Sequence, residues 1–329
     1  MGNCERASVG IRFEDRPLRL VCALAAGMLI AGCGDVEDSS TAPPVQPSPE
    51  LMAMQPELER VMRTLEGLDH VGLPRSSLGL TAAGVAVQLG SLADRTFVAM
   101  ADGGEEVPPV TTGATAVMAL ILDPRRGDIL FSLLHGVFEP TAAHIHRGPA
   151  GVNGPIVVPL DHRRRLSFGF ARLMASDVAL LQAGGLYTNV HSRRFPAGEV
   201  RGQLLRLGEA LYTTSMSGAE EVPPRPTTAT GHLAVILNSQ QNKFRASGSF
   251  QGLSTVSTAA HIHNGIPGVN GPILFPLIIS PPGMLAGSLS AMLPIGAAEV
   301  ALLDAGGLYV NVHSMMFPGG EIRGQLLRK

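Results

Sequence analysis

Short β-prone runs, separated by turns rich in glycine and proline, dominate the chain from residue 96 onward. In the run 142–146, Ala143 and Ile145 alternate with His144 and His146. Because successive side chains of a strand point to opposite faces of a sheet, this alternation predicts a strand with one apolar face. We expect seven strands in the region, at 96–101, 114–122, 128–134, 142–146, 156–160, 186–192 and 199–205. One helix is expected between them, capped by Ser176 and ended by Gly184.

The same pattern occurs twice because the chain contains an internal duplication. Residues 141–160 match 258–277 at 15 of 20 positions, and residues 177–206 match 299–328 at 23 of 30 positions. Each copy is long enough to form its own core. We therefore predict an all-β protein of two tandem antiparallel β-sandwich domains, Ig-like or superoxide-dismutase-like, at 94–207 (domain 1) and 209–329 (domain 2).

The first 32 residues have the pattern of an export signal. Three arginines precede an apolar run at 20–30 that is too short to span a membrane. The sequence Ile30-Ala31-Gly32-Cys33 follows, and it resembles the lipobox of bacterial lipoproteins. The resemblance implies that Cys33 carries lipid and anchors the exported chain to a bacterial membrane. The residue after the cysteine is Gly34 and not an aspartate, which resembles the pattern that directs such lipoproteins to the outer membrane. Cleavage of an ordinary signal peptide near Ala31 is the alternative.

Residues 33–93 are expected to follow the lipidated cysteine as a tether with one short helical segment. Prolines and acidic residues up to Pro56 favour an extended, solvated chain. From 57 to 68, apolar residues recur at helical spacing. Residues 70–93 are apolar without a clear period.

Composition excludes several classes of function. Charged residues make up 16% of the chain and the formal net charge is −2, which argues against a nucleic-acid-binding protein. Tryptophan is absent and there are three tyrosines, so a large aromatic stacking platform is excluded. No cysteine follows Cys33, so both domains must be stabilised by their cores without disulfides.

Six of the ten histidines recur in register in the two copies. Two histidines at i and i+2 of a strand lie roughly 6.6 Å apart along it, and both rings can lean onto one ion. A third histidine from a neighbouring strand would complete a three-nitrogen site suited to copper or zinc. We expect one such ion per domain, bound by His144, His146 and His191 and by His261, His263 and His313.

Further polar residues share the predicted face with these histidines. They are Tyr187, Asn189, Glu199 and Arg201 in domain 1, and Tyr309, Asn311, Glu321 and Arg323 in domain 2. With the apolar residues in the core, this face should be the outer surface of the sheet. Glu199 would then orient an imidazole N–H. The alternative is a hydrogen-bond network without metal, in which Asn189 holds the loop at 148–154.

Four ordered sequence blocks, present in both copies, resemble the CHRD domain, which is named for chordin. They are Glu-Glu-Val-Pro-Pro at 105–109, Ala-His-Ile-His-x-Gly at 143–148, Gly-Leu-Tyr-x-Asn-Val-His at 185–191 and Gly-Glu-x-Arg-Gly-Gln at 198–203. The resemblance covers about 97–206 and 212–328. It is typical of exported bacterial proteins and implies neither an agreed activity nor a ligand.

Three functions are consistent with these observations. The favoured one is a non-catalytic binding protein of the cell envelope, with two CHRD domains that bind copper or zinc and with a protein partner in or outside the envelope that is still unknown. The second is a metal-dependent redox enzyme related in architecture to copper–zinc superoxide dismutase, although that family needs further histidines and a zinc-binding aspartate. The third is a structural surface protein with a histidine hydrogen-bond network.

Overall fold

The structure is a computed structural model that describes residues 46–69 and 94–329. The predicted export signal, Cys33 and the first part of the tether lie outside the described residues, as does the segment 70–93. Within the described ranges, no helix is both long enough and apolar enough to cross a membrane.

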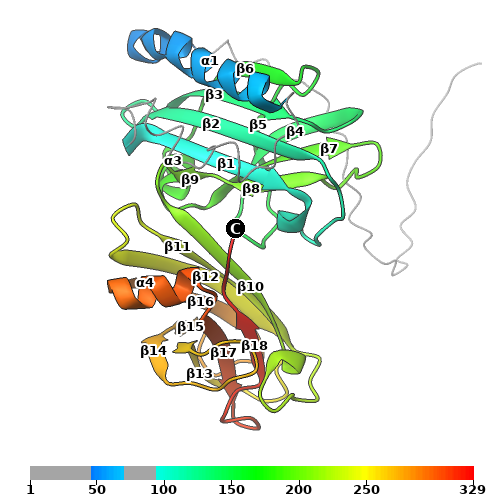
Figure 1. The fold of residues 1–329 in the computed structure, drawn as a ribbon, viewed down its shortest axis with the longest axis vertical. Helices are drawn as coiled ribbons and strands as arrows, with labels where there is room; N and C mark the ends of the chain where they lie inside the picture. The colour runs from blue at the N-terminus through cyan, green and yellow to red at the C-terminus, as the bar shows by residue number, and fades with distance from the viewer. Residues whose placement is uncertain (1–45, 70–93) are drawn as a thin grey trace, which may run out of the picture. The chain divides into compact units, whose positions relative to one another are not determined.

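Helix α1 (Pro49–Asp69) precedes the first domain and is longer than the segment expected at 57–68. It includes residues 49–56, which we had assigned to the tether. Pro49 occupies the first helical position, where the missing N–H and the fixed backbone angle of proline cost nothing. Leu51, Leu58 and Met62 are fully buried in a cluster with residues of the adjacent sheet. In Figure 1, α1 lies across β3 (Asp128–His135) and β6 (Leu166–Arg172), which it contacts.

Domain 1 is one antiparallel sheet that bends over itself. Its strands run in the order β5-β4-β7-β8-β1-β2-β3-β6, with β9 paired to β1. Strands β8 and β1 meet through a single register pair, Asp102 with Arg201. Residues of β4 and β7 share one core with residues of β2 and β3, so the two halves of the sheet face each other as the layers of a sandwich. The remaining strands are β1 (Thr96–Asp102), β2 (Thr115–Asp123), β4 (Pro140–Arg147), β5 (Ile156–Pro159), β7 (Leu186–Ser192), β8 (Val200–Gln203) and β9 (Leu205–Arg206).

Domain 2 repeats this topology in the order β14-β13-β17-β18-β10-β11-β12-β16-β15, with β19 paired to β10. The prediction of two tandem antiparallel β-sandwich domains is therefore confirmed. The strands are β10 (Ala210–Ser217), β11 (Thr230–Leu237), β12 (Lys243–Gln251), β13 (Ser257–Asn264), β14 (Ile273–Pro276), β15 (Ile278–Ser280), β16 (Gly287–Pro294), β17 (Leu308–Ser314), β18 (Ile322–Gln325) and β19 (Leu327–Arg328).

Two elements of domain 1 differ from expectation. Strand β6 was not predicted, because Ser167 and Gly169 interrupt its apolar pattern. Gly169 is required there, since a Cβ atom would lie 2.5 Å from the Phe131 ring. Helix α3 (Ala175–Gln182) is capped by Met174, so Ser176 lies inside its first turn instead of at the cap. Its counterpart in domain 2 is α4 (Ala297–Asp304).

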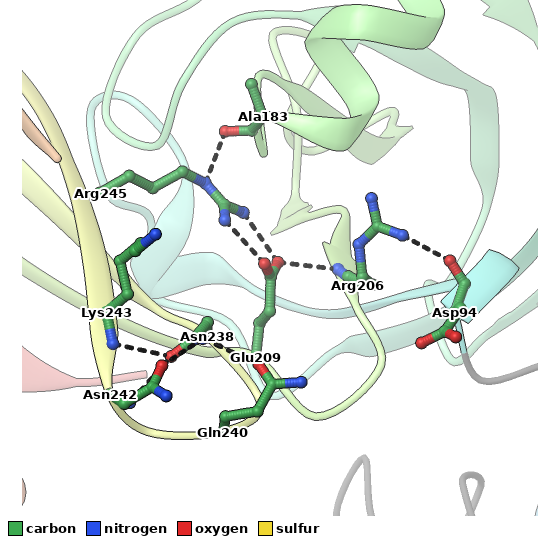
Figure 2. Close-up of polar contacts among 9 residues, drawn as sticks. All are labelled: Asp94, Ala183, Arg206, Glu209, Asn238, Gln240, Asn242, Lys243 and Arg245. Carbon is green, nitrogen blue, oxygen red and sulfur yellow. Dashed lines mark hydrogen bonds and ion pairs between the residues drawn. The ribbon is translucent and has the colours of Figure 1, made fainter. Parts of the chain in front are cut away.

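In the segment between the domains, the carboxylate of Glu209 accepts hydrogen bonds from two arginines. Figure 2 shows both of its oxygens accepting from the Arg245 guanidinium, at 2.7 Å each, while one also accepts from the Arg206 backbone N–H at 3.0 Å. A two-pronged ion pair of this kind fixes orientation as well as distance. Glu209 therefore links β9 with β12.

We predict that Leu58→Ala destabilises the protein because the side chain, 0% exposed, leaves a cavity between α1 and the sheet. The expected loss is about 2–5 kcal/mol in the free energy of unfolding, measured by urea denaturation. Met52→Ala is the matched control on the same helix, since Met52 is 55% exposed, and it should cost less than about 0.5 kcal/mol. Equal effects of the two substitutions would show that α1 does not pack on the sheet.

Candidate metal centre in each domain

Neighbouring strands β4 and β7 place the three histidines of domain 1 on one face of the sheet. In the antiparallel register, His144 lies opposite Asn189 and His146 opposite Tyr187, while His191 lies opposite Ala142. Ala143 and Ile145, between the two β4 histidines, are buried in the core. The alternation read from the sequence thus sets the direction of the imidazoles.

The six predicted ligands come together as two groups of three. In domain 1, His144 Nδ1 lies 3.2 Å from His191 Nε2, and one nitrogen from each of the three rings lies within 4.8 Å of the others. Domain 2 has the same arrangement, with 3.2 Å between His261 Nδ1 and His313 Nε2. Nitrogens that share one tetrahedral ion at about 2 Å lie about 3.3 Å apart. One pair in each domain already has this spacing, and a nitrogen of the third ring lies within 4.8 Å of both.

Backbone carbonyls determine which nitrogen of the His146 and His191 rings carries the proton and which has a lone pair available for a metal. His146 Nδ1 lies 2.9 Å from the Gly154 carbonyl oxygen, and His191 Nδ1 lies 2.9 Å from that of Pro196. Because a carbonyl can only accept, each Nδ1 carries the proton and donates, and the neutral ring presents a lone pair at Nε2. His263 and His313 donate in the same way to Gly271 and Pro318. Metal-binding histidines are usually oriented by such a bond from the second ring nitrogen.

Burial keeps these imidazoles uncharged at neutral pH. Burial, together with the neighbouring rings of His191 and His146, lowers the pKa of His144 to about 4. Burial is also the main cause that lowers the pKa of His146 and of His191. The pKa of each histidine of the domain 2 group is lowered for the same reason. Neutral imidazole is the form that binds metal.

The polar neighbours of the histidines are not on the surface, contrary to the prediction. Tyr187, Asn189, Glu199 and Arg201 are buried, as are Tyr309, Asn311, Glu321 and Arg323. The loop at 148–154 folds over this face of the sheet. Arg201, 1% exposed, donates to the carbonyl oxygens of Pro149 and Val152 in that loop, at 3.0 Å each. The face is thus opposite the apolar core but still covered.

A stack of three side chains lies beneath this loop. The Tyr187 ring is parallel to the His146 ring to within 7°, with centroids 4.9 Å apart, and the Arg201 guanidinium carbon lies 3.6 Å from the Tyr187 centroid. Domain 2 repeats the stack with His263, Tyr309 and Arg323. The stack fixes the plane of one imidazole in each site.

Glu199 and Glu321 do not orient imidazoles, so that prediction is wrong. Glu199 accepts from the Thr112 hydroxyl at 2.7 Å, and Glu321 accepts from Thr227 and from the backbone N–H of Ser254. These carboxylates secure loops to the sheet. The imidazole N–H groups that we had assigned to them are held by backbone carbonyls instead.

Sequence reasoning missed a buried carboxylate beside each site. Glu106 and Glu221 were not among the predicted site residues, but both are buried. Burial raises the pKa of each to about 7, against the opposing charges of Arg201 and Arg323. The signal was the exact recurrence of the Glu-Glu-Val-Pro-Pro block in both copies.

The same three buried atoms in each domain have no hydrogen-bond partner among the described residues. They are a histidine Nε2, an asparagine Oδ1 and a glutamate Oε1, from His146, Asn189 and Glu106 and from His263, Asn311 and Glu221. A buried polar atom without a partner costs about 1–3 kcal/mol. The same cost of unpartnered polar atoms occurs in both copies. This repetition is consistent with a site that binds a ligand or ion.

We predict that Glu221→Gln gains stability relative to the wild type as the pH rises from about 5 to about 8. The folded-state pKa, about 7, is above the ordinary value of 4.5, so the folded state binds the extra proton between these values. The wild-type carboxylate therefore loses stability as pH rises through this window, whereas the amide does not titrate. Urea denaturation at both pH values measures the difference.

Glu220→Gln is the control for this experiment, because Glu220 is the exposed neighbour of Glu221 in the same turn. Its stability relative to wild type should be the same at both pH values. An unchanged difference for Glu221→Gln would contradict the burial of that carboxylate.

Comparison with known proteins identifies the family. The family model described as the CHRD domain matches residues 97–204 and 212–326, one match in each domain. No curated protein and no solved structure matches the chain. The resemblance found in the four sequence blocks is confirmed, and the chain belongs to the CHRD domain family, of which it carries two domains in tandem.

Proposed function

We propose that the protein is a non-catalytic, envelope-anchored binding protein in which each CHRD domain holds one copper or zinc ion. The observation that carries this proposal is the repeated convergence of three imidazoles, His144, His146 and His191 in domain 1 and their counterparts in domain 2. Three neutral nitrogens suit copper and zinc. Calcium and magnesium take oxygen ligands and would not be selected by this donor set.

The hydrogen bonds of His144 and His261 distinguish the metal proposal from a purely structural hydrogen-bond network. His146 and His191 each hold a backbone carbonyl, so both have a structural role without metal. In the described structure, the only hydrogen bond of the His144 ring is to His191, and that of the His261 ring is to His313. Neither ring holds a backbone group, so each would serve a structural network only through its contact with another imidazole. The redox-enzyme alternative rests on architecture alone.

We predict that the wild-type chain binds two zinc ions and that His144→Ala binds one. The single variant loses the domain 1 ligand set, while the unchanged domain 2 serves as its matched control. The double variant His144→Ala/His261→Ala should bind none. Metal content after dialysis, measured by mass spectrometry, gives the stoichiometry.

The same variants test the structural alternative in metal-free protein. His144→Ala should melt close to the wild type, because it breaks no bond to the backbone. His146→Ala should melt lower, because it removes the hydrogen bond to the Gly154 carbonyl. A wild-type stoichiometry near zero would refute the metal proposal, and so would a double variant that still binds two ions.

The envelope location depends on lipidation of Cys33, which we propose from the sequence. Cys33→Ser should abolish incorporation of radiolabelled palmitate and move the protein from the membrane to the soluble fraction. A wild-type chain that is released without lipid would show that an ordinary signal peptide is cleaved instead.

A further inference from the structure

Domain 2 exposes three methionines on two loops beside its histidine group. Met315 and Met316, in the turn after β17, are 67% and 60% exposed, and Met284, in the turn before β16, is 50% exposed. Met315 follows His313 by two residues. Exposed thioethers add little to the core, so their position needs another explanation.

Hydrogen bonds hold the two loops against a third, at 253–257. The Met315 N–H donates to the Val256 carbonyl oxygen at 3.2 Å, and the Met316 N–H donates to the Thr255 hydroxyl at 2.8 Å. The Ser257 N–H donates to the Met284 carbonyl oxygen at 3.1 Å. The backbones of the three methionines are therefore attached to consecutive residues of one loop.

Glu321 secures this arrangement from the inside. Its carboxylate accepts from the Ser254 N–H at 2.7 Å and from the Ser314 hydroxyl at 2.5 Å. One buried side chain thus connects the start of the 253–257 loop to the residue before Met315. These contacts hold the backbone beside Met315, while the methionine side chains are exposed.

Domain 1 has the same backbone contact with different side chains. Arg193 and Arg194 stand where domain 2 has Met315 and Met316, and the Arg193 N–H donates to the Glu139 carbonyl oxygen at 3.3 Å. The fold therefore does not require methionine at these positions. The thioethers are a property of domain 2.

We propose that Met284, Met315 and Met316 form a surface site for Cu(I) in domain 2. Thioether sulfur is a soft, uncharged donor that selects Cu(I) over zinc and over hard cations. Methionine has three rotatable bonds, so sulfurs from neighbouring loops can converge on one ion. The site goes beyond the histidine groups and does not require that they hold metal.

The experiment compares Cu(I) binding by the full-length protein and by the variant Met284→Leu/Met315→Leu/Met316→Leu, under anaerobic conditions against a chromogenic Cu(I) chelator. Leucine keeps size and hydrophobicity at exposed positions, so the fold should be retained, which circular dichroism checks. The variant should bind one Cu(I) fewer per chain. X-ray absorption of the copper-loaded wild type should show Cu–S scattering that the variant lacks.

Met292→Leu is the matched control, because Met292 is an exposed methionine of domain 2 that lies within β16 and away from these loops. It should bind as much Cu(I) as the wild type. Equal Cu(I) stoichiometry in the triple variant, or no Cu–S scattering in the wild type, would overturn the proposal and leave the three side chains as an ordinary apolar surface.

Zinc binding distinguishes the methionine site from the histidine sites. The triple methionine variant should keep the wild-type zinc stoichiometry, and His144→Ala/His261→Ala should keep the Cu–S signal. If the histidines bind no metal at all, the Cu–S signal should still be present in the wild type. The two proposals therefore fail on different measurements.

Discussion

The buried guanidinium of Arg201 lies against the ring of Tyr187 and depends on the 148–154 loop for hydrogen-bond acceptors. A buried arginine needs acceptors for its N–H groups, and the carbonyls of the 148–154 loop supply them. The loop in turn needs the arginine, since several of its carbonyls point inward. Cation–π contact with the tyrosine adds about 2 kcal/mol when both groups are desolvated. Because Tyr187 also stacks on His146, the orientation of one imidazole follows from this pairing of loop and arginine.

The two copies provide an internal comparison of what this arrangement requires. The stack, the carbonyl contacts of the imidazoles and the buried glutamate occur in both domains. The residues at the edge of the site differ, with Arg193 and Arg194 in one copy and Met315 and Met316 in the other. The two domains therefore share the buried residues of the site and differ in the exposed residues at its edge.

Much of the fold and of the site could be predicted from the sequence because strand alternation is a local property. It assigned His144 and His146 to one face, and the duplication pointed to His191 as their partner. Local patterns could not show that the polar face is covered, because the covering depends on contacts between Arg201 and a loop about fifty residues earlier. The burial of Glu106 could not be predicted for the same reason. Helix α1 was too short in the prediction because the prolines and acidic residues up to Pro56 were taken to favour an extended chain, whereas Pro49 occupies the first turn of the helix.

The pairing of β1 with β8 and β9 has a consequence for how each domain forms. The first strand of the domain binds the last two, so the sheet is closed only by residues about a hundred positions apart. Contacts this distant in the sequence carry a large loop-closure cost and slow the folding of β proteins. During synthesis, β1 can pair with β2 early, but the half of the sheet that carries the histidines cannot pair with β1 until Arg201 in β8 has been made. The order of assembly therefore places the histidine-bearing half last, after the hairpin of β1 and β2.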